Sequence, residues 1–177
     1  MNKITTKKLA LAGLFIAMGL LMPFLAAQIP EIGKRLLPMH IPVLLCGYIT
    51  GGSIGLIVGA IVPLLRSVLF SMPVLFPNAI AMSFELAAYG FFTGLFYKML
   101  PKKNVYIYVS LIISMIFGRI VWGAASFALI TLSGGKFTFA MFLAGAFIDA
   151  IPGIIIQIIL IPALVMALQR VKITERA

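Results

Sequence analysis

Hydrophobic residues fill six stretches of the chain, and short polar or glycine- and proline-containing segments separate these stretches. Most of them have the length that an α-helix needs to cross a hydrocarbon core of roughly 30 Å at about 1.5 Å per residue. We therefore expect an all-α integral membrane protein, with six transmembrane helices in a single compact bundle. The predicted helices cover residues 6–27, 39–50, 53–70, 77–100, 105–132 and 138–170.

The part from residue 37 to residue 96 differs from a plain membrane anchor. Five prolines and the pair Gly51-Gly52 divide it into short pieces, and it carries His40, Arg66 and Glu85. The helix expected over 39–50 is too short to cross the bilayer core unaided. Breaks and ionisable groups together indicate several helices folded around a polar site.

The first apolar stretch follows basic residues, as a signal peptide does, but 9–27 is longer than a typical signal core and five more apolar segments come after it. We expect a retained first span. Small residues, Gly13 and Ala17 with Ala10 and Gly19 nearby, are predicted to form one face of this helix. Such a face lets another helix approach closely in lipid, either within the bundle or on a separate subunit.

Composition agrees with the pattern. The 177 residues are 63% hydrophobic and 10% charged, and the mean hydropathy is +1.18. A soluble domain is roughly half apolar and about a quarter charged. The excess of apolar residues requires lipid as the solvent for much of the surface. Residues 1–177 are expected to form one transmembrane domain, with no room for a soluble catalytic domain.

The net charge of +10 comes mainly from basic residues that flank the apolar stretches. This distribution is a signal of membrane topology, so we expect no nucleic-acid partner. With both termini inside, nine basic residues lie on the inner face and three on the outer face, which predicts an N-in, C-in orientation. The three outer residues are Lys34, Arg35 and Lys136.

Five ionisable residues lie in the predicted spans: His40, Arg66, Glu85, Arg119 and Asp149. A charge at the centre of a bilayer costs several kcal/mol, so each is expected to face the interior with a partner. Helix positions place Arg119 at a depth from which it can pair with Glu85 or Asp149. That pair is either structural or part of a binding pocket.

Arg66 and His40 are expected near the outer ends of their helices, where together they would present a cation and a ring nitrogen to a ligand carboxylate. The alternatives are an Arg66 that reaches toward lipid headgroups and a His40 bonded to backbone. Asn78 either binds the ligand or caps a helix. Four more side chains are candidates to line a pocket: Trp122, Tyr89, Ser126 and Gln157.

Several enzyme motifs are missing from the sequence. One histidine and one cysteine leave no cluster for a transition metal. Gly134-Gly135-Lys136 lacks the upstream glycine of a phosphate-binding loop and is followed by Phe137. We therefore expect no enzymatic activity, no metal and no cofactor. Uphill transport by this chain would need an ion gradient or a partner that hydrolyses ATP.

The sequence resembles the substrate-binding S components of the energy-coupling factor (ECF) vitamin transporters, in the group of pantothenate, riboflavin, folate and niacin binders. The resemblance covers essentially the whole chain and includes the small-residue face at Gly13 and Ala17. Three segments carry most of it: MHIPVLLCGYITGG (39–52), VPLLRSVLFSMP (62–73) and MSFELAAYGFFTGLFY (82–97). The family motif on the first helix is usually Ala-x-x-x-Ala, and here its first position is Gly13.

The resemblance implies a multi-pass protein of the bacterial plasma membrane that captures a vitamin or vitamin precursor near the outer face. It implies docking through the first helix on a transmembrane coupling subunit, which two cytoplasmic ATPases drive. We expect the ligand to enter under the loop 28–38, with its anionic group on Arg66 or Arg119. Hydrogen bonds would come from His40, Asn78 and Glu85. Pantothenate is the first candidate and nicotinate the second.

Two other classes remain open at this point. A self-sufficient carrier would couple a small solute to protons through Glu85, Asp149 and Arg119. A membrane-embedded enzyme of lipid metabolism would need clustered acids or a metal site, and the four acids of this chain are scattered. Gradient-driven uptake by the chain alone would favour the carrier.

Overall fold

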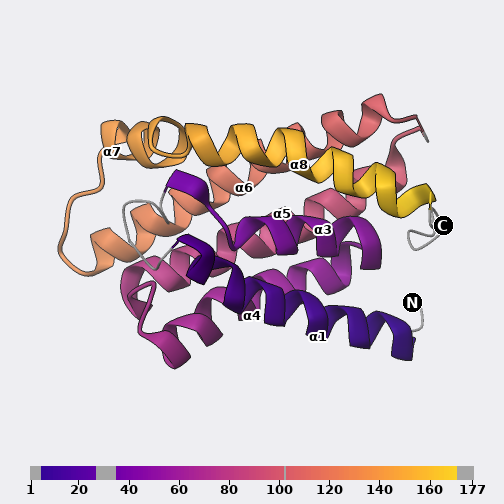
Figure 1. Ribbon diagram of the computed structural model, residues 1–177. Coiled ribbons are helices and arrows are strands. Elements are labelled where there is room, and N and C mark those ends of the chain that lie inside the picture. Colours follow the sequence, from indigo (N-terminus) through magenta and orange to yellow (C-terminus); the bar gives the residue numbers. More distant parts are fainter. Residues whose placement is uncertain (1–4, 27–34, 102, 171–177) are drawn as a thin grey trace.

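The computed structural model describes residues 5–26, 35–101 and 103–170, and this part of the chain is helical with no strand. The six expected helices correspond to longer and shorter helical pieces (Figure 1). They are α1 (Thr6–Leu21), a 3₁₀ turn (Met22–Ala26), α3 (His40–Thr50), α4 (Gly52–Phe70), a π turn (Leu75–Ala79), α5 (Ile80–Met99), α6 (Val105–Leu132), α7 (Phe139–Leu143), a second π turn (Ala144–Ile148) and α8 (Ile151–Arg170).

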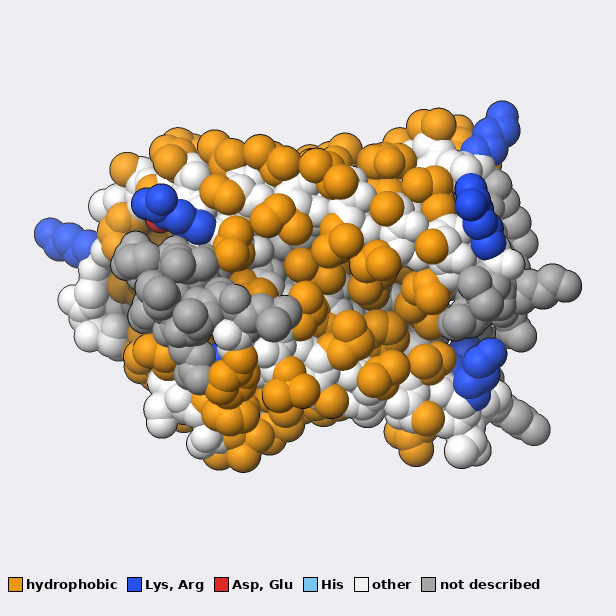
Figure 2. All heavy atoms as spheres, in the orientation of Figure 1, with side chains coloured by type: hydrophobic (Ala, Val, Ile, Leu, Met, Phe, Trp, Pro, Cys, Tyr) orange, Lys and Arg blue, Asp and Glu red, His pale blue; other side chains and the backbone are white. Residues whose placement is uncertain are grey.

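Five of these helical segments are long and apolar enough to cross a membrane, and two shorter apolar segments are His40–Thr50 and Phe139–Ile148. On the face shown in Figure 2, hydrophobic side chains cover the middle of the bundle, and Lys and Arg side chains gather at its two ends. An apolar belt between two charged ends matches a bilayer with water on both sides. The chain is a multi-pass membrane protein.

The breaks between helices have local causes. Gly51, with φ of 97°, separates α3 from α4, and Ser71 ends α4 in the left-handed region with φ of 56°. Glycine adopts such a φ without strain, which explains why the turn after α3 falls at Gly51. Thr138 caps α7 by accepting a hydrogen bond from the backbone N–H of Met141.

The helix expected over 138–170 is interrupted. A π turn follows α7, and a turn at Asp149 and Ala150 separates it from α8. A continuous helix of that length would measure about 50 Å, well beyond the bilayer core, so a bend in this region keeps the segment inside the bundle. The two pieces meet just before Pro152, which suits the first turn of α8.

Helices α4 and α5 form the centre of the bundle, and their backbones touch. A Cβ atom on Gly90 would lie 2.1 Å from the carbonyl oxygen of Gly55, and one on Gly59 would lie 2.1 Å from that of Leu86. A Cβ atom on Gly94 would lie 2.1 Å from the backbone nitrogen of Gly52. Small residues allow helices in lipid to pack this closely, where lipid tails remove most of the hydrophobic drive for association.

Helix α1 lies on the outside of the bundle, against α3 and α4. Phe15 and Gly19 face inward, and Gly19 packs on Val62. Gly13 and Ala17 are exposed, and no atom lies within 4 Å of a Cβ built on Gly13. The expectation that Gly19 shares their face is therefore wrong. Helix α1 begins and α8 ends at the same end of the bundle (Figure 1).

Candidate functional site

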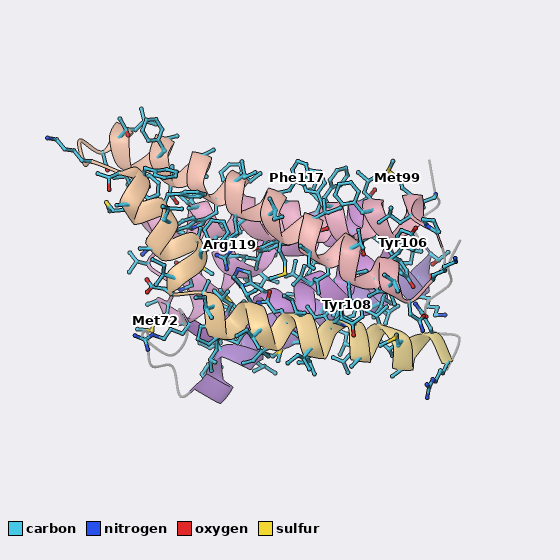
Figure 3. The ribbon with its side chains drawn as sticks, turned by 90° about the horizontal axis from the view of Figure 1, so that it is seen from above. Met72, Met99, Tyr106, Tyr108, Phe117 and Arg119 are labelled. Carbon is cyan, nitrogen blue, oxygen red and sulfur yellow. The ribbon has the colours of Figure 1, made fainter. Side chains whose placement is uncertain are left out.

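A polar cluster lies inside the bundle where α3, α5 and α6 meet. Its three ionisable side chains, which we name the polar triad, are His40, Glu85 and Arg119, only 1%, 2% and 4% exposed. Arg119 Nη1 lies 2.8 Å from Glu85 Oε1, and His40 Nε2 lies 3.6 Å from the same oxygen. Arg119 points from α6 into the bundle (Figure 3). Of the two acids that the sequence offers as its partner, Glu85 is the one the structure pairs with it.

Each residue of the triad reaches the interior from a defined helix position. His40 is the first residue of α3, Glu85 lies in the second turn of α5, and Arg119 is near the middle of α6. Glycine next to Arg119 makes room for a fourth side chain, because a Cβ on Gly118 would lie 2.5 Å from the Tyr89 ring. Tyr89 follows Glu85 by four residues and therefore shares its helix face.

Tyr89 extends the cluster. Its ring packs edge-on against the His40 ring with centroids 5.4 Å apart, and its hydroxyl interacts electrostatically with Glu85 and Arg119. From the sequence, Tyr89 was expected only as one of several side chains that could line a pocket. The four-residue spacing from Glu85 was the signal that could have placed it at the site.

Many polar atoms in this interior have no hydrogen-bond partner. They include both ring nitrogens of His40, the Tyr89 hydroxyl, and Nε and Nη2 of Arg119. Gln157 on α8 is fully buried, and neither its amide oxygen nor its amide nitrogen is bonded. Such groups cost about 1–3 kcal/mol each when they are buried without a partner. Their concentration in one protein interior is typical of a site that binds a polar molecule or ordered water.

Helix α8 closes this side of the bundle by packing against α3 and α6, which carry His40 and Arg119. Its start is held by the end of the first loop. A Cβ on Gly153 would lie 2.7 Å from the carbonyl oxygen of Arg35 and 2.9 Å from that of Leu36. Residues 27–34, most of the loop expected to cover the site, lie outside the described residues.

Arg66 lies elsewhere. Its guanidinium donates a hydrogen bond to the carbonyl oxygen of Leu20, near the end of α1, and lies 5.1 Å and 5.3 Å from the ring centroids of Phe24 and Phe70. A cation at a helix C-terminus and over aromatic faces is stabilised without an acid. His40 contacts Glu85 and Tyr89, and no described contact joins it to Arg66. The expectation that both side chains meet one ligand group stays a prediction.

No ion pair among the described residues joins the other predicted site residues to the triad. Asn78 is exposed on the π turn before α5. Asp149 is exposed and forms no ion pair among the described residues, so it does not share the interior with Glu85 and Arg119. Trp122 packs against Phe137, Phe142 and Gly145. It therefore belongs to an aromatic cluster between α6 and α7.

That aromatic cluster borders a shallow apolar groove of about 530 Å³. Phe127, Phe137 and Phe142 line it together with Ile120 and Gly123, and no lining residue is charged. An open apolar groove on a membrane protein is what lipid tails cover. The groove is therefore distinct from the polar triad, which lies inside the bundle.

The sequence model of the family described as ECF transporter, substrate-specific component, matches residues 7–165. The chain belongs to this family. No curated protein and no solved structure matches the chain. Membership makes it a transport subunit and not an enzyme, as the sequence predicts. Substrate-specific components of ECF transporters bind a small-molecule substrate and associate with a membrane coupling subunit and ATPases.

Proposed function

We propose that this S component captures a vitamin or vitamin precursor at the outer face of the bacterial plasma membrane, with pantothenate as the first candidate and nicotinate as the second. The observation that supports the proposal is the polar triad with its unpartnered atoms, inside an otherwise apolar bundle. Arginine, histidine, tyrosine and glutamine side chains suit a small molecule that carries a carboxylate together with hydroxyl or amide groups.

The proposed topology has six crossings with both termini inside. Helix α3 is a short crossing shielded by its neighbours, which agrees with the burial of ten of its eleven residues. The segment from α7 to α8 is the sixth crossing. In this orientation, the start of α5 faces outward, and Glu85 lies in the outer half of the bundle. The path to Glu85 from the outer face would therefore be shorter than the path from the cytoplasmic face.

Transport itself is proposed to depend on partners. The exposed Gly13 and Ala17 face of α1 would dock on the transmembrane coupling subunit, where small side chains allow close helix contact. Two cytoplasmic ATPases would supply the energy. This division agrees with a chain in which the sequence holds no nucleotide-binding motif.

A ligand screen on the detergent-purified chain alone tests the proposal. The panel holds pantothenate, nicotinate, riboflavin, folate, thiamine and pyridoxine, and the readouts are thermal stabilisation and the fluorescence of Trp122, the single tryptophan. We expect one vitamin to raise the melting temperature at micromolar concentration or below. No response to any vitamin, combined with proton-driven uptake by the chain alone in vesicles, would overturn the proposal in favour of a self-sufficient carrier.

A further inference from the structure

Only one end of the Arg119 guanidinium contacts an acidic side chain of the described protein. Its Nη1 end is held by Glu85 at 2.8 Å, while Nε and Nη2 are buried and form no hydrogen bond. In a guanidinium group, the Nε–H and one Nη2–H bond lie along the same edge and point in parallel. This edge, which we name the Nε/Nη2 edge, matches the two oxygens of one carboxylate.

We infer that the Nε/Nη2 edge of Arg119 is the carboxylate-recognition element of the substrate site, and that Glu85 positions it by holding Nη1. The inference rests on the proposed function. It also specifies the substrate class: a small molecule with a free, planar carboxylate, whose amide and alcohol analogues are rejected.

The burial of Arg119 favours a ligand carboxylate bound at the Nε/Nη2 edge. Without such a ligand, both donors of this edge would stay buried with no acceptor. Arg119 is 4% exposed, in a bundle whose outer surface faces lipid, so bulk water does not satisfy the two donors. A donor fixed in this way rejects an analogue that lacks the matching acceptors, because the donor would then stay buried and unpaired.

Charge balance points to one carboxylate. Glu85 cancels the charge of Arg119, and His40 lies 3.6 Å from Glu85 Oε1. A carboxylate would add one negative charge beside the Arg119 guanidinium, whereas a phosphate dianion would add two. A phosphate dianion would leave uncompensated negative charge in the interior, at a cost of several kcal/mol.

The second buried arginine does not compete for this role. The guanidinium of Arg66 donates a hydrogen bond to the carbonyl oxygen of Leu20 and lies next to two phenylalanine rings that contact each other. Of the two arginines in the described helices' interior, Arg119 is the one with two free parallel donors next to other unbonded polar groups.

The test compares acids with neutral analogues on the unaltered full chain in detergent. Nicotinate is paired with nicotinamide, and pantothenate with panthenol, and affinities are measured by calorimetry. We expect the acid that binds to do so about 10- to 100-fold more tightly than its neutral partner. Equal affinities for acid and neutral analogue would overturn the inference while the proposed function stands. Stabilisation by riboflavin, thiamine or pyridoxine alone would do the same.

A matched pair of variants tests the edge itself. Arg119→Lys keeps the charge and removes the parallel donors, so it should lose most of the preference for the acid over its neutral analogue. Arg170→Lys, the same change at an exposed position on α8, should keep that preference. An Arg119→Lys protein that discriminates as well as the original would overturn the inference.

Two further outcomes would count against recognition of a carboxylate by Arg119. Stabilisation by inorganic phosphate at the concentration effective for the acid would contradict recognition of a carboxylate. No binding of any vitamin would remove the proposed function, and the inference would fall with it. The comparison of neutral analogues needs no variant, so the inference stays testable even where Arg119→Lys does not fold.

Discussion

Gly55 of α4 and Gly90 of α5 lie so close that each occupies the space of the other's missing side chain. A Cβ on Gly55 would lie 2.4 Å from the carbonyl oxygen of Gly90, and one on Gly90 would lie 2.1 Å from that of Gly55. Contact at this distance is between backbones, which cannot move aside as a side chain can. The two central helices are therefore held at a fixed separation, and Glu85 on α5 is held in place with them.

Gly90→Ala should destabilise the isolated chain by about 1–3 kcal/mol, because the added methyl group must push α4 and α5 apart. The gain in helix propensity, about 1 kcal/mol, does not compensate for this strain. Thermal unfolding in detergent measures the change. Gly13→Ala is the matched control, since its methyl group meets no atom within 4 Å. Equal melting temperatures for both variants would contradict the backbone contact.

Glu85→Gln should be among the most destabilising conservative changes in the chain. It leaves the Arg119 guanidinium buried without its anion, a loss of about 3–5 kcal/mol. The double variant Glu85→Gln with Arg119→Met should be more stable than the single one, because no unpaired charge remains. Asp149→Asn removes an exposed acid and should change stability by about 0.5 kcal/mol at most. Additive effects of the two changes at 85 and 119 would show that the pair is not coupled.

Arg66→Ala should lower stability by about 1–3 kcal/mol and leave ligand affinity unchanged, because the guanidinium bonds the end of α1 and packs against Phe24 and Phe70. Thermal unfolding and calorimetry on the same preparation separate the two effects. Arg66→Lys should be intermediate, since the charge near the helix end is retained. A large loss of affinity in a folded Arg66→Ala protein would return Arg66 to the substrate site.

Gly13→Leu should weaken co-purification with the coupling subunit and ATPases, because a bulky side chain would keep a partner helix away from α1. Ligand affinity of the isolated chain should stay the same, since Gly13 is exposed and a Cβ on it meets no atom of the bundle within 4 Å. Ala128→Leu adds the same bulk to an exposed position on α6 and serves as the control. Equal recovery of the complex with both variants would argue against docking through this face.

Gly153→Ala should reduce ligand affinity more than stability. Its methyl group would collide with the backbone at Arg35 and Leu36, which joins the first loop to α3 and His40. A shift of this segment would displace His40 relative to Glu85. Calorimetry and thermal unfolding measure the two effects, and an unchanged affinity would show that the contact does not influence the site.

Hydropathy located most of the helical stretches, because lipid imposes the same requirement on every span, but it did not show the break within 138–170. The helix over 105–132 is found as expected, and the burial of Glu85 and Arg119 followed from the cost of charges in a bilayer. Helical depth also restricted the partners of Arg119 to two acids. Rotation of each helix about its axis then selected Glu85, and the hydrophobic pattern does not encode that rotation.

The contact of Arg66 with the end of α1 could not be predicted from the sequence, because it joins segments that lie far apart in the chain. Leu20 and Phe24 come from the first helix and the turn after it, and nothing in the sequence near Arg66 shows that α1 ends beside it. Asp149 was expected in the interior and is exposed, for a related reason. The expected helix over 138–170 was too long for one crossing, and the π turn that bends it carries no sequence signature beyond Pro152 and Gly153 nearby.

The glycine contacts between α4 and α5 also act as a seal. A polar cluster inside a membrane protein invites leakage of water and protons along any gap that reaches it. Next to Glu85, Leu86 presents its carbonyl oxygen directly to Gly59, and the contacts at Gly55 and Gly52 continue the closure along α5. A continuous chain of water molecules does not fit between two backbones that are in contact. These contacts therefore leave no path for water between α4 and α5 along the described glycines.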